Sequence, residues 1–209
     1  MTSYNPIKYW TEHGRTYMTK HLSRTKTDFT HRNRFQIQEQ AIIQYLDKLY
    51  PSFETVLELG AGFGRISKLL IDRYQSITNY TLVDLSPSQI KNAKKYLSNS
   101  NKVGIEYHVS TIENFYSPER YDLVLLSEVL MHQFPSKMPY LIDIIVSLSK
   151  KHIINIDWYE VKQPAYKIAD HNFIHDYQKL YMQNQQVQNV IQTPIKHINQ
   201  SIFHTQVIV

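Results

Sequence analysis

The sequence has 209 residues, of which 42% are hydrophobic and 20% are charged, and these values are typical of one globular domain. It contains no cysteine, which excludes disulfides, thiolate metal sites, iron–sulfur clusters and a cysteine nucleophile. No run of about 18 apolar residues occurs and the first residues show no signal-peptide pattern, so we expect a cytoplasmic protein without a membrane partner.

The net charge of +5 is concentrated in one segment near the N-terminus. Residues 8–34 hold seven Lys or Arg against two acids, whereas the rest of the chain holds sixteen of each sign. The same segment carries His13, His21 and His31, so its positive potential would grow below neutral pH. This pattern fits either an ordinary solvated face or a surface that attracts an anionic partner.

The residues before position 55 predict one or two helices, because Ile37, Ala41, Leu46 and Leu49 follow a helical stripe that ends at Pro51. From position 55 onward, apolar strand-like runs alternate with helical patterns, which is typical of a parallel sheet with crossover helices. The predicted strands are residues 55–59, 80–84, 105–109, 121–127 and 151–157, and the predicted helices between them are residues 65–74, 88–97 and 137–150.

The end of the sequence departs from this alternation. A helix is expected over residues 173–183, and two β-rich runs, 187–195 and 201–209, are separated by a five-residue connection suited to a hairpin. Ser86 and Pro87 are expected to start the helix that follows residue 84, with Ser86 as its N-cap. The predicted fold is therefore α/β: a doubly wound, seven-stranded, Rossmann-like sheet, mostly parallel, with an antiparallel C-terminal edge hairpin.

Residues 56–64 read Val-Leu-Glu-Leu-Gly-Ala-Gly-Phe-Gly, a buried strand followed by glycines at every second position. Gly60, Gly62 and Gly64 would let the chain turn tightly against a flat ligand, because glycine reaches backbone angles closed to other residues. The dinucleotide fingerprint needs a glycine one residue later, where this chain has Arg65. A glycine turn in some other α/β domain remains the alternative.

Three segments resemble the motifs of the class I S-adenosylmethionine (SAM) dependent methyltransferases. Glu-Leu-Gly-Ala-Gly-Phe-Gly resembles the first motif, Asp-Leu-Ser-Pro-Ser-Gln-Ile from Asp84 resembles the second, and Tyr121 to His132 resembles the fourth. The order of predicted elements also matches that family over roughly residues 50–209. The resemblance implies SAM as cofactor, a helical N-terminal cap at residues 1–50 and a methyltransferase domain at residues 51–209.

Two carboxylates are the strongest candidates for cofactor binding. Glu58 lies in an apolar strand, where its carboxylate needs a hydrogen-bond donor. It either binds the amino acid end of the cofactor or holds the glycine loop in place. Asp84 ends the next strand, where a carboxylate can accept both hydroxyls of a ribose. The resemblance implies a wider set, although Thr111 stands where the family often has an aspartate. The predicted cofactor-binding residues are Glu58, Gly60, Ala61, Gly62, Gly64, Asp84, Leu85, Thr111, Ile112 and Ser127.

The acceptor side of the site is less defined. His132 follows the fourth strand and is the candidate general base, with a packed structural histidine as the alternative. Tyr17, Asp157, Trp158 and Tyr159 are predicted to bind the acceptor, the last three because the carboxyl ends of parallel strands carry ligand sites.

A divalent metal site at Glu128, His132, His171 and His175 would match the small-RNA 2′-O-methyltransferases, but Met131 replaces one of their ligands, so no metal is expected. We therefore expect a SAM-dependent methyltransferase acting on an oxygen or nitrogen of a small or carrier-attached acceptor, anionic acceptors included. The alternatives are an RNA methyltransferase steered by the basic N-terminal segment and a noncatalytic SAM-binding or partner-activating subunit. The sequence leaves the oligomeric state open.

Overall fold

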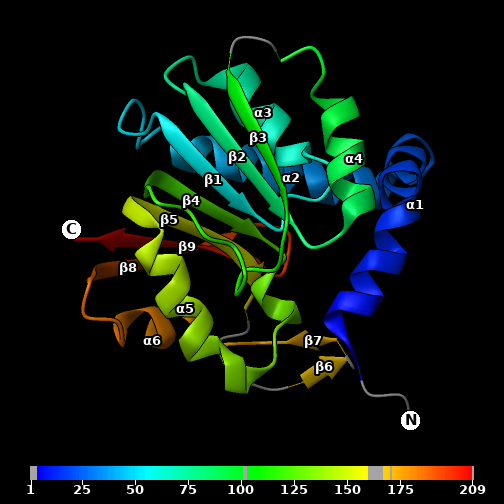
Figure 1. The fold of residues 1–209 in the computed structure, drawn as a ribbon. Coiled ribbons are helices and arrows are strands. Elements are labelled where there is room, and N and C mark those ends of the chain that lie inside the picture. The colour runs from blue at the N-terminus through cyan, green and yellow to red at the C-terminus, as the bar shows by residue number, and fades with distance from the viewer. Residues whose placement is uncertain (1–3, 101–102, 160–166, 170, 209) are drawn as a thin grey trace.

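The computed structural model describes residues 4–100, 103–159, 167–169 and 171–208. Its centre is a seven-stranded sheet with the order β3-β2-β1-β4-β5-β9-β8 (Figure 1). Strands β1 to β5 are mutually parallel where they pair, and β9 is antiparallel to both β5 and β8. The predicted sheet with its antiparallel hairpin is confirmed. The strands are β1 (Thr55–Leu59), β2 (Asn79–Asp84), β3 (Gly104–Val109), β4 (Tyr121–Ser127), β5 (Ser149–Trp158), β8 (Val187–Ile195) and β9 (Gln200–Val207).

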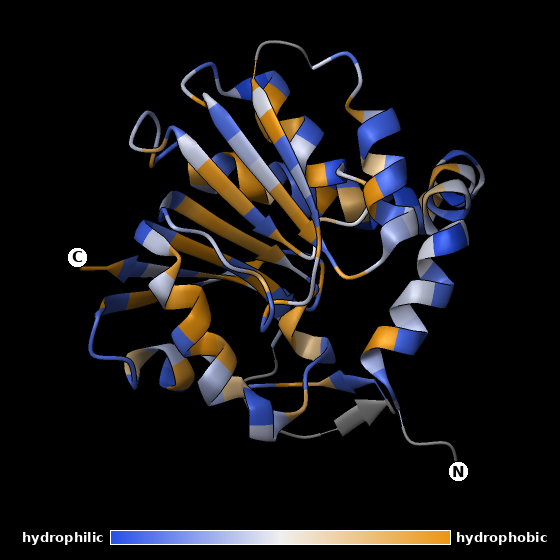
Figure 2. Cartoon of the chain, in the orientation of Figure 1, coloured by the Kyte–Doolittle hydropathy of each residue, from blue (hydrophilic) through white to orange (hydrophobic). Residues whose placement is uncertain are grey.

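Helices cover both faces of this sheet, and the central strands β1 and β4 are accordingly apolar and buried on both sides (Figure 2). On one face, residues of α2 (Phe29–Leu46), α3 (Arg65–Arg73) and α4 (Pro87–Tyr96) form a core with side chains such as Val56 and Leu123. On the other face, α5 (Met138–Ser147) and α6 (Tyr177–Met182) pack on side chains such as Leu57 and Phe203. No helix of the described residues is long and apolar enough to span a membrane.

The N-terminal segment forms two helices, α1 (Pro6–Thr27) and α2, which meet at Asp28. The backbone N–H of Asp28 donates to the carbonyl of Arg24 at 2.7 Å and ends α1. The Asp28 carboxylate then accepts from the backbone N–H of His31 at 2.9 Å and starts α2. Figure 2 shows that α1 is largely hydrophilic, and Figure 1 places it beside α4 at the margin of the sheet.

Gly14, in the middle of α1, permits a close contact between this helix and the start of α4. A Cβ atom at position 14 would lie 2.2 Å from Oγ and 2.9 Å from Cβ of Ser86. Ser86 occupies the N-cap position of α4 as predicted, but its side chain makes no capping hydrogen bond. The prediction of a Ser86 cap was therefore wrong in its chemistry: its hydroxyl is buried by α1, and its backbone N–H is bound by Asp84 at 2.8 Å.

Replacing Gly14 by alanine is expected to lower the free energy of unfolding by about 1 kcal/mol. Overpacking of this kind costs about 1–3 kcal/mol, and alanine returns about 1 kcal/mol of helix propensity. Urea unfolding followed by circular dichroism measures the change, with Thr16→Ala, an exposed position of the same helix, as the control. A Gly14→Ala variant more stable than the Thr16→Ala variant would contradict the close contact.

Two predicted helices have different bounds in the structure. The helix expected over residues 173–183 is only α6, because the Asp176 side chain caps it by accepting from the backbone N–H of Lys179 at 3.0 Å. Phe173, the first residue of the predicted helix, instead ends β7 (Asn172–Phe173), which pairs with β6 (Lys167–Ala169) in a small sheet that the sequence did not predict. The helix expected over residues 137–150 begins with the 3₁₀ turn η2 (Pro135–Lys137) and ends at Ser147, since β5 starts at Ser149.

Candidate active site

A cavity of about 750 Å³ lies where β1, β2 and β4 end, between the sheet and the N-terminal helices. The carboxyl edge of a parallel sheet is the usual ligand site of α/β folds. Residues from the strand ends form its floor, and residues from α1 and α2 form its roof. Its lining includes Tyr4, Ile7, Trp10, Tyr17, Arg34, Glu58, Gly60, Ala61, Gly62, Arg65, Asp84, Leu85, Gln89, Thr111, Ile112, Glu113, Ser127, Glu128, His132 and Lys137.

The glycine loop forms one wall of this cavity. Gly60, Gly62 and Gly64 have φ of 74°, 57° and 84°, a left-handed range that strains other residues. Backbone N–H groups of Gly60 and Ala61 donate to the carbonyl of Val83 at 2.8 and 3.0 Å, which fastens the loop to β2. Gly64 is not among the lining residues, because it precedes α3 and faces Leu97 of the core. The structure thus brings three of the four predicted loop residues to the cavity.

Asp84 stands at the cavity wall with its carboxylate held by two backbone groups. Its two oxygens accept from the N–H groups of Gly62 and Ser86, each at 2.8 Å. Burial raises the pKa of Asp84, and the two amide donors oppose that rise. Each carboxylate oxygen has a further lone pair, so the carboxylate is oriented and retains acceptors for hydroxyl groups.

Glu58 is buried beside the cavity and finds its donors within the protein. One carboxylate oxygen accepts from Ser67 Oγ at 2.5 Å and from Tyr80 Oη at 2.8 Å. Burial raises the pKa of Glu58 to about 7, although both hydroxyl donors lower it. The structure therefore gives Glu58 a role in holding β1, β2 and α3 together, and it also places Glu58 in the lining of the cavity.

The raised pKa makes Glu58 a source of pH-dependent stability. Between pH 4.5 and 7 Glu58 is protonated in the folded chain and ionised in the unfolded chain. The contribution of this proton to the free energy of unfolding is therefore full below pH 4.5 and is lost as the pH rises to 7. Relative to Glu58→Gln, the wild-type free energy of unfolding should fall by roughly 2 to 4 kcal/mol across that window. Urea unfolding of both proteins at pH 4.5 and 8 measures the difference, and a constant difference would contradict the raised pKa.

The remaining predicted cofactor residues line the same cavity. Leu85 follows Asp84, Thr111 and Ile112 follow β3, and Ser127 ends β4. Ser127 Oγ and Gln89 Oε1 are buried without a hydrogen-bond partner among the described residues. Unpaired buried polar atoms at a cavity wall suit a ligand that brings its own donors and acceptors. Together with the acceptors of Asp84, these residues fit a polar, adenosine-bearing ligand.

A polar network from α2 borders the cavity, and sequence reasoning missed it. Glu128 has a left-handed φ of 57° and forms an ion pair with Arg34. The network continues from Glu128 through Gln200 (2.9 Å) and Gln38 (2.8 Å) to Arg65 (2.5 Å), which also pairs with Glu39 at 2.6 Å. Arg34 lay in the basic segment, but nothing in the sequence indicated which of its cations faces inward.

His132 faces the cavity from the 3₁₀ turn that follows β4, Leu130–His132. Its Nδ1 lies 2.8 Å from the backbone carbonyl of His171, and its ring centre lies 4.6 Å from that of Trp10. A carbonyl only accepts, so Nδ1 carries the proton and Nε2 of the neutral ring keeps its lone pair. Burial lowers the pKa of His132, which favours the neutral ring. This is the arrangement of a histidine able to accept a proton.

Asp157, Trp158 and Tyr159, the acceptor residues predicted at the end of β5, are not among the residues that line the cavity. Asp157 is fully buried, which raises its pKa well above the usual range, whereas the amides of Leu130 and Met131 lower it. Trp158 lies on the opposite side of the strand, in a separate hollow beside α2.

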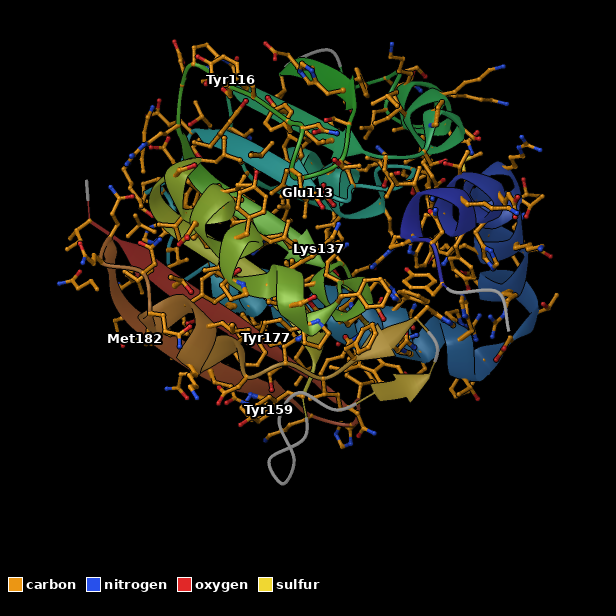
Figure 3. The ribbon with its side chains drawn as sticks, turned by 60° about the horizontal axis from the view of Figure 1, so that its bottom comes forward. Glu113, Tyr116, Lys137, Tyr159, Tyr177 and Met182 are labelled. Atoms are coloured by element: carbon orange, nitrogen blue, oxygen red, sulfur yellow. The ribbon has the colours of Figure 1, made fainter. Side chains whose placement is uncertain are left out.

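Tyr159 packs on Phe203, with ring centres 5.5 Å apart, and Figure 3 shows it far from Glu113 and Lys137. Successive strand residues face opposite ways, so Asp157 and Trp158 could not both face one cavity.

Tyr17, the other predicted acceptor residue, does line the cavity. Its ring lies against those of His21 and Phe63, both 6.2 Å away between centres, and burial raises its pKa. His171 and His175, considered above as metal ligands, both lie outside helices: His171 precedes β7, and His175 precedes α6. Tyr17, Trp10 and His132 therefore all line the cavity, and Trp10 lies against His132.

Residues 56–152 match the family model described as "Methyltransferase domain". Over 109 residues the chain is 30% identical to malonyl-[acyl-carrier protein] O-methyltransferase of Anoxybacillus flavithermus, covering 52% of this chain and 39% of that one. Over 91 residues it is 34% identical to probable polyketide synthase 26 of Dictyostelium discoideum, covering 36% of this chain and 4% of that one. The chain thus spans well under half of each of these relatives.

The fold also matches solved structures. The magnesium protoporphyrin IX methyltransferase of Synechocystis PCC 6803, crystallised with SAM, aligns over 99% of both chains with a TM-score of 0.73 at 14% identity. The N-methyltransferase NodS of Bradyrhizobium japonicum aligns over 85% of this chain and 98% of its own, with a TM-score of 0.66 at 15% identity. The fold is therefore that of the class I SAM-dependent methyltransferases, and residues 56–152 are the part of the chain that resembles a methyltransferase domain in sequence.

Proposed function

We propose that this protein transfers a methyl group from SAM to an oxygen or nitrogen of a small or carrier-attached acceptor. The observation that carries the proposal is that Asp84 and His132 line the same cavity. The end near Asp84 offers carboxylate oxygens and unpaired polar atoms. The end near His132 offers an aromatic wall and a histidine with a lone pair.

Asp84, Leu85, Thr111 and Ile112 would hold the adenosine part of SAM, and the loop from Gly60 to Gly62 would lie against it. Bound SAM supplies an electrophilic methyl group on a sulfonium. The protein's contribution is mainly positioning, which can supply about 7 to 11 kcal/mol when the reacting atoms are held in line. For a hydroxyl acceptor, His132 Nε2 takes the proton as the acceptor oxygen gains the methyl group.

The charges of the cavity wall indicate what part of the acceptor enters it. Arg34, Arg65 and Lys137 are the lysines and arginines that line the cavity, and each forms an ion pair with a carboxylate of the chain. In Figure 3, Lys137 and Glu113 lie close together at the cavity, and their charged atoms are 3.1 Å apart. These internal pairs favour an uncharged reacting group, so negative charge on the acceptor would be recognised outside the cavity.

The two alternatives receive less support. A noncatalytic subunit would need no path from the cofactor to an acceptor, whereas the cavity reaches His132 and Trp10. An RNA methyltransferase would use the basic segment to contact the phosphates of the RNA backbone. Such binding is recognised by a steep fall of RNA affinity with rising salt concentration.

Incubation with isotopically methyl-labelled SAM tests the proposed function, with metabolite extracts and acylated carrier proteins as acceptor pools. The expected result is transfer of label to one class of acceptor, and its loss in an Asp84→Ala variant. Release of S-adenosylhomocysteine without any labelled product, or no turnover in any pool, would contradict the proposed function.

A further inference from the structure

The outer side of α1 carries more positive charge than the fold requires. This helix holds five Lys or Arg and one acid, Glu12. Lys8, Arg15, Leu22 and Lys26 follow one another at spacings of seven, seven and four residues, so they share one side of the helix. All four are exposed. We call this side, defined by these four residues, the basic face of α1.

The three cations of this face are not used within the described part of the chain. Among those residues, neither Lys8, Arg15 nor Lys26 forms an ion pair, whereas the nearby Arg24 pairs with Asp28. They also stand apart from the apolar stripe that α1 buries, which includes Gly14 and His21. Glu12, four residues after Lys8, is exposed on the same side of the helix, so the face has an excess of two positive charges. Excess charge that neither packs nor pairs is available to a partner of the opposite sign.

The basic face begins beside the mouth of the cavity. Pro6, Ile7 and Trp10, in the first turns of α1, line the cavity, and Ile7 is 57% exposed. Lys8 follows Ile7 directly and is exposed. A domain bound along α1 would therefore hold one end next to the entrance. An acceptor on a flexible arm could reach His132 from that position.

We infer that the basic face of α1 docks an acidic carrier domain that presents the acceptor on a flexible arm. This rests on the proposed function, in which the acceptor is small or carrier-attached. A carrier-attached acceptor is favoured over a free one by charge. The cations that line the cavity are paired with carboxylates of the chain, whereas the cations on the basic face of α1 are unpaired among the described residues and can bind an acidic carrier. The 22 residues of α1 extend about 33 Å, which matches the side of a small helical domain.

RNA is the competing partner of a basic helix, and the exposed apolar residues favour protein. Single-stranded RNA is held by aromatic side chains on which bases stack. Along α1 the large exposed hydrophobic residues are Ile7 and Leu22, which are both aliphatic. Aliphatic side chains surrounded by charged ones match a protein interface, in which a polar rim encloses apolar contacts.

Charge reversal tests the inference. The variant Lys8→Glu, Arg15→Glu, Lys26→Glu is compared with Lys48→Glu, Lys179→Glu, Lys196→Glu, which changes the net charge equally at exposed positions away from α1. Fluorescence anisotropy measures binding of a labelled, purified acyl carrier protein of net negative charge at 50 mM and 300 mM salt. We expect the α1 variant to bind at least about tenfold more weakly at low salt and the control less than about threefold.

Three outcomes would overturn the inference: no binding of the carrier to the wild type at low salt, equal loss in both variants, or tighter binding of a 20-nucleotide single-stranded RNA than of the carrier. Calorimetric titration of the wild type and both variants with SAM distinguishes failure of the docking surface from failure of the proposed methyltransferase function. Retained SAM binding with no carrier binding removes the docking surface and leaves the methyltransferase proposal standing. Absence of SAM binding in the wild type removes the proposed function itself.

Discussion

Replacing His132 by alanine is expected to reduce kcat by roughly 10²- to 10⁴-fold for a hydroxyl acceptor, the usual contribution of a positioned general base. The reason is geometric: the Nδ1 proton is directed to the carbonyl of His171, so Nε2 is the atom left to take a proton. Single-turnover kinetics with labelled SAM measure the loss. His108→Ala, an exposed histidine on β3, is the matched control and should keep its activity.

The pH profile separates a base from a packing residue at position 132. Burial lowers the pKa of His132 below its ordinary value, so wild-type activity should fall as pH drops through that lowered pKa and should be flat above it. The alanine variant should lose this acid limb while keeping its affinity for SAM. A variant with kcat within about threefold of the wild type, or one that loses SAM affinity instead, would assign His132 a structural role.

Replacing Asp84 by alanine should weaken SAM binding by about 1.5 to 3 kcal/mol, roughly 10- to 150-fold in Kd. Its carboxylate is buried, oriented by the amides of Gly62 and Ser86, and placed in the cavity wall. Hydrogen bonds to a charged acceptor are stronger than neutral ones, so Asp84→Asn should lie between alanine and the wild type.

Calorimetric titration with SAM measures this order of affinities. Asp72→Ala is the control, because Asp72 is an exposed carboxylate paired with Lys68 on α3. Since Asp84→Ala also removes acceptors for two backbone amides, urea unfolding of each variant shows whether the fold is retained. Unchanged affinity in a folded Asp84→Ala variant would remove Asp84 from the cofactor site.

Periodicity and glycine spacing were enough to predict most of the fold. The strand predicted at 55–59 and the strand predicted at 121–127 match β1 and β4 residue for residue, because both are short apolar runs with clear ends. The helix predicted at 173–183 is shorter in the structure, because Phe173 ends β7 and α6 begins only at Tyr177. Its true start depends on the side chain of Asp176, a local hydrogen bond that periodicity does not contain.

The residues of the site also fall into those that the sequence predicts and those that it does not. Residues fixed by a motif next to a strand end, such as Asp84, reach the cavity, since backbone geometry alone places them there. Trp158 and Tyr159 do not, because the path of the chain after β5 depends on packing against α2 and Phe203. Arg34 and Trp10 enter from separate helices, and their position depends on how α1 and α2 fold back over the sheet. Such long-range placement is absent from a single sequence.

The basic N-terminal segment now has two separate roles in this account. Arg34, on α2, turns inward and pairs with Glu128 at the cavity. Lys8, Arg15 and Lys26, on α1, face outward. The same stretch of sequence therefore contributes to the site and to the proposed docking surface, and substitutions in it need to be interpreted helix by helix.

Calorimetric titration of the wild-type protein with S-adenosylhomocysteine, the demethylated product of SAM, tests the central claim most directly. It requires no knowledge of the acceptor and reports on the cavity between the glycine loop, Asp84 and Thr111. The account predicts saturable binding of one molecule per chain, weakened in Asp84→Ala. The absence of any binding heat at millimolar ligand would contradict it.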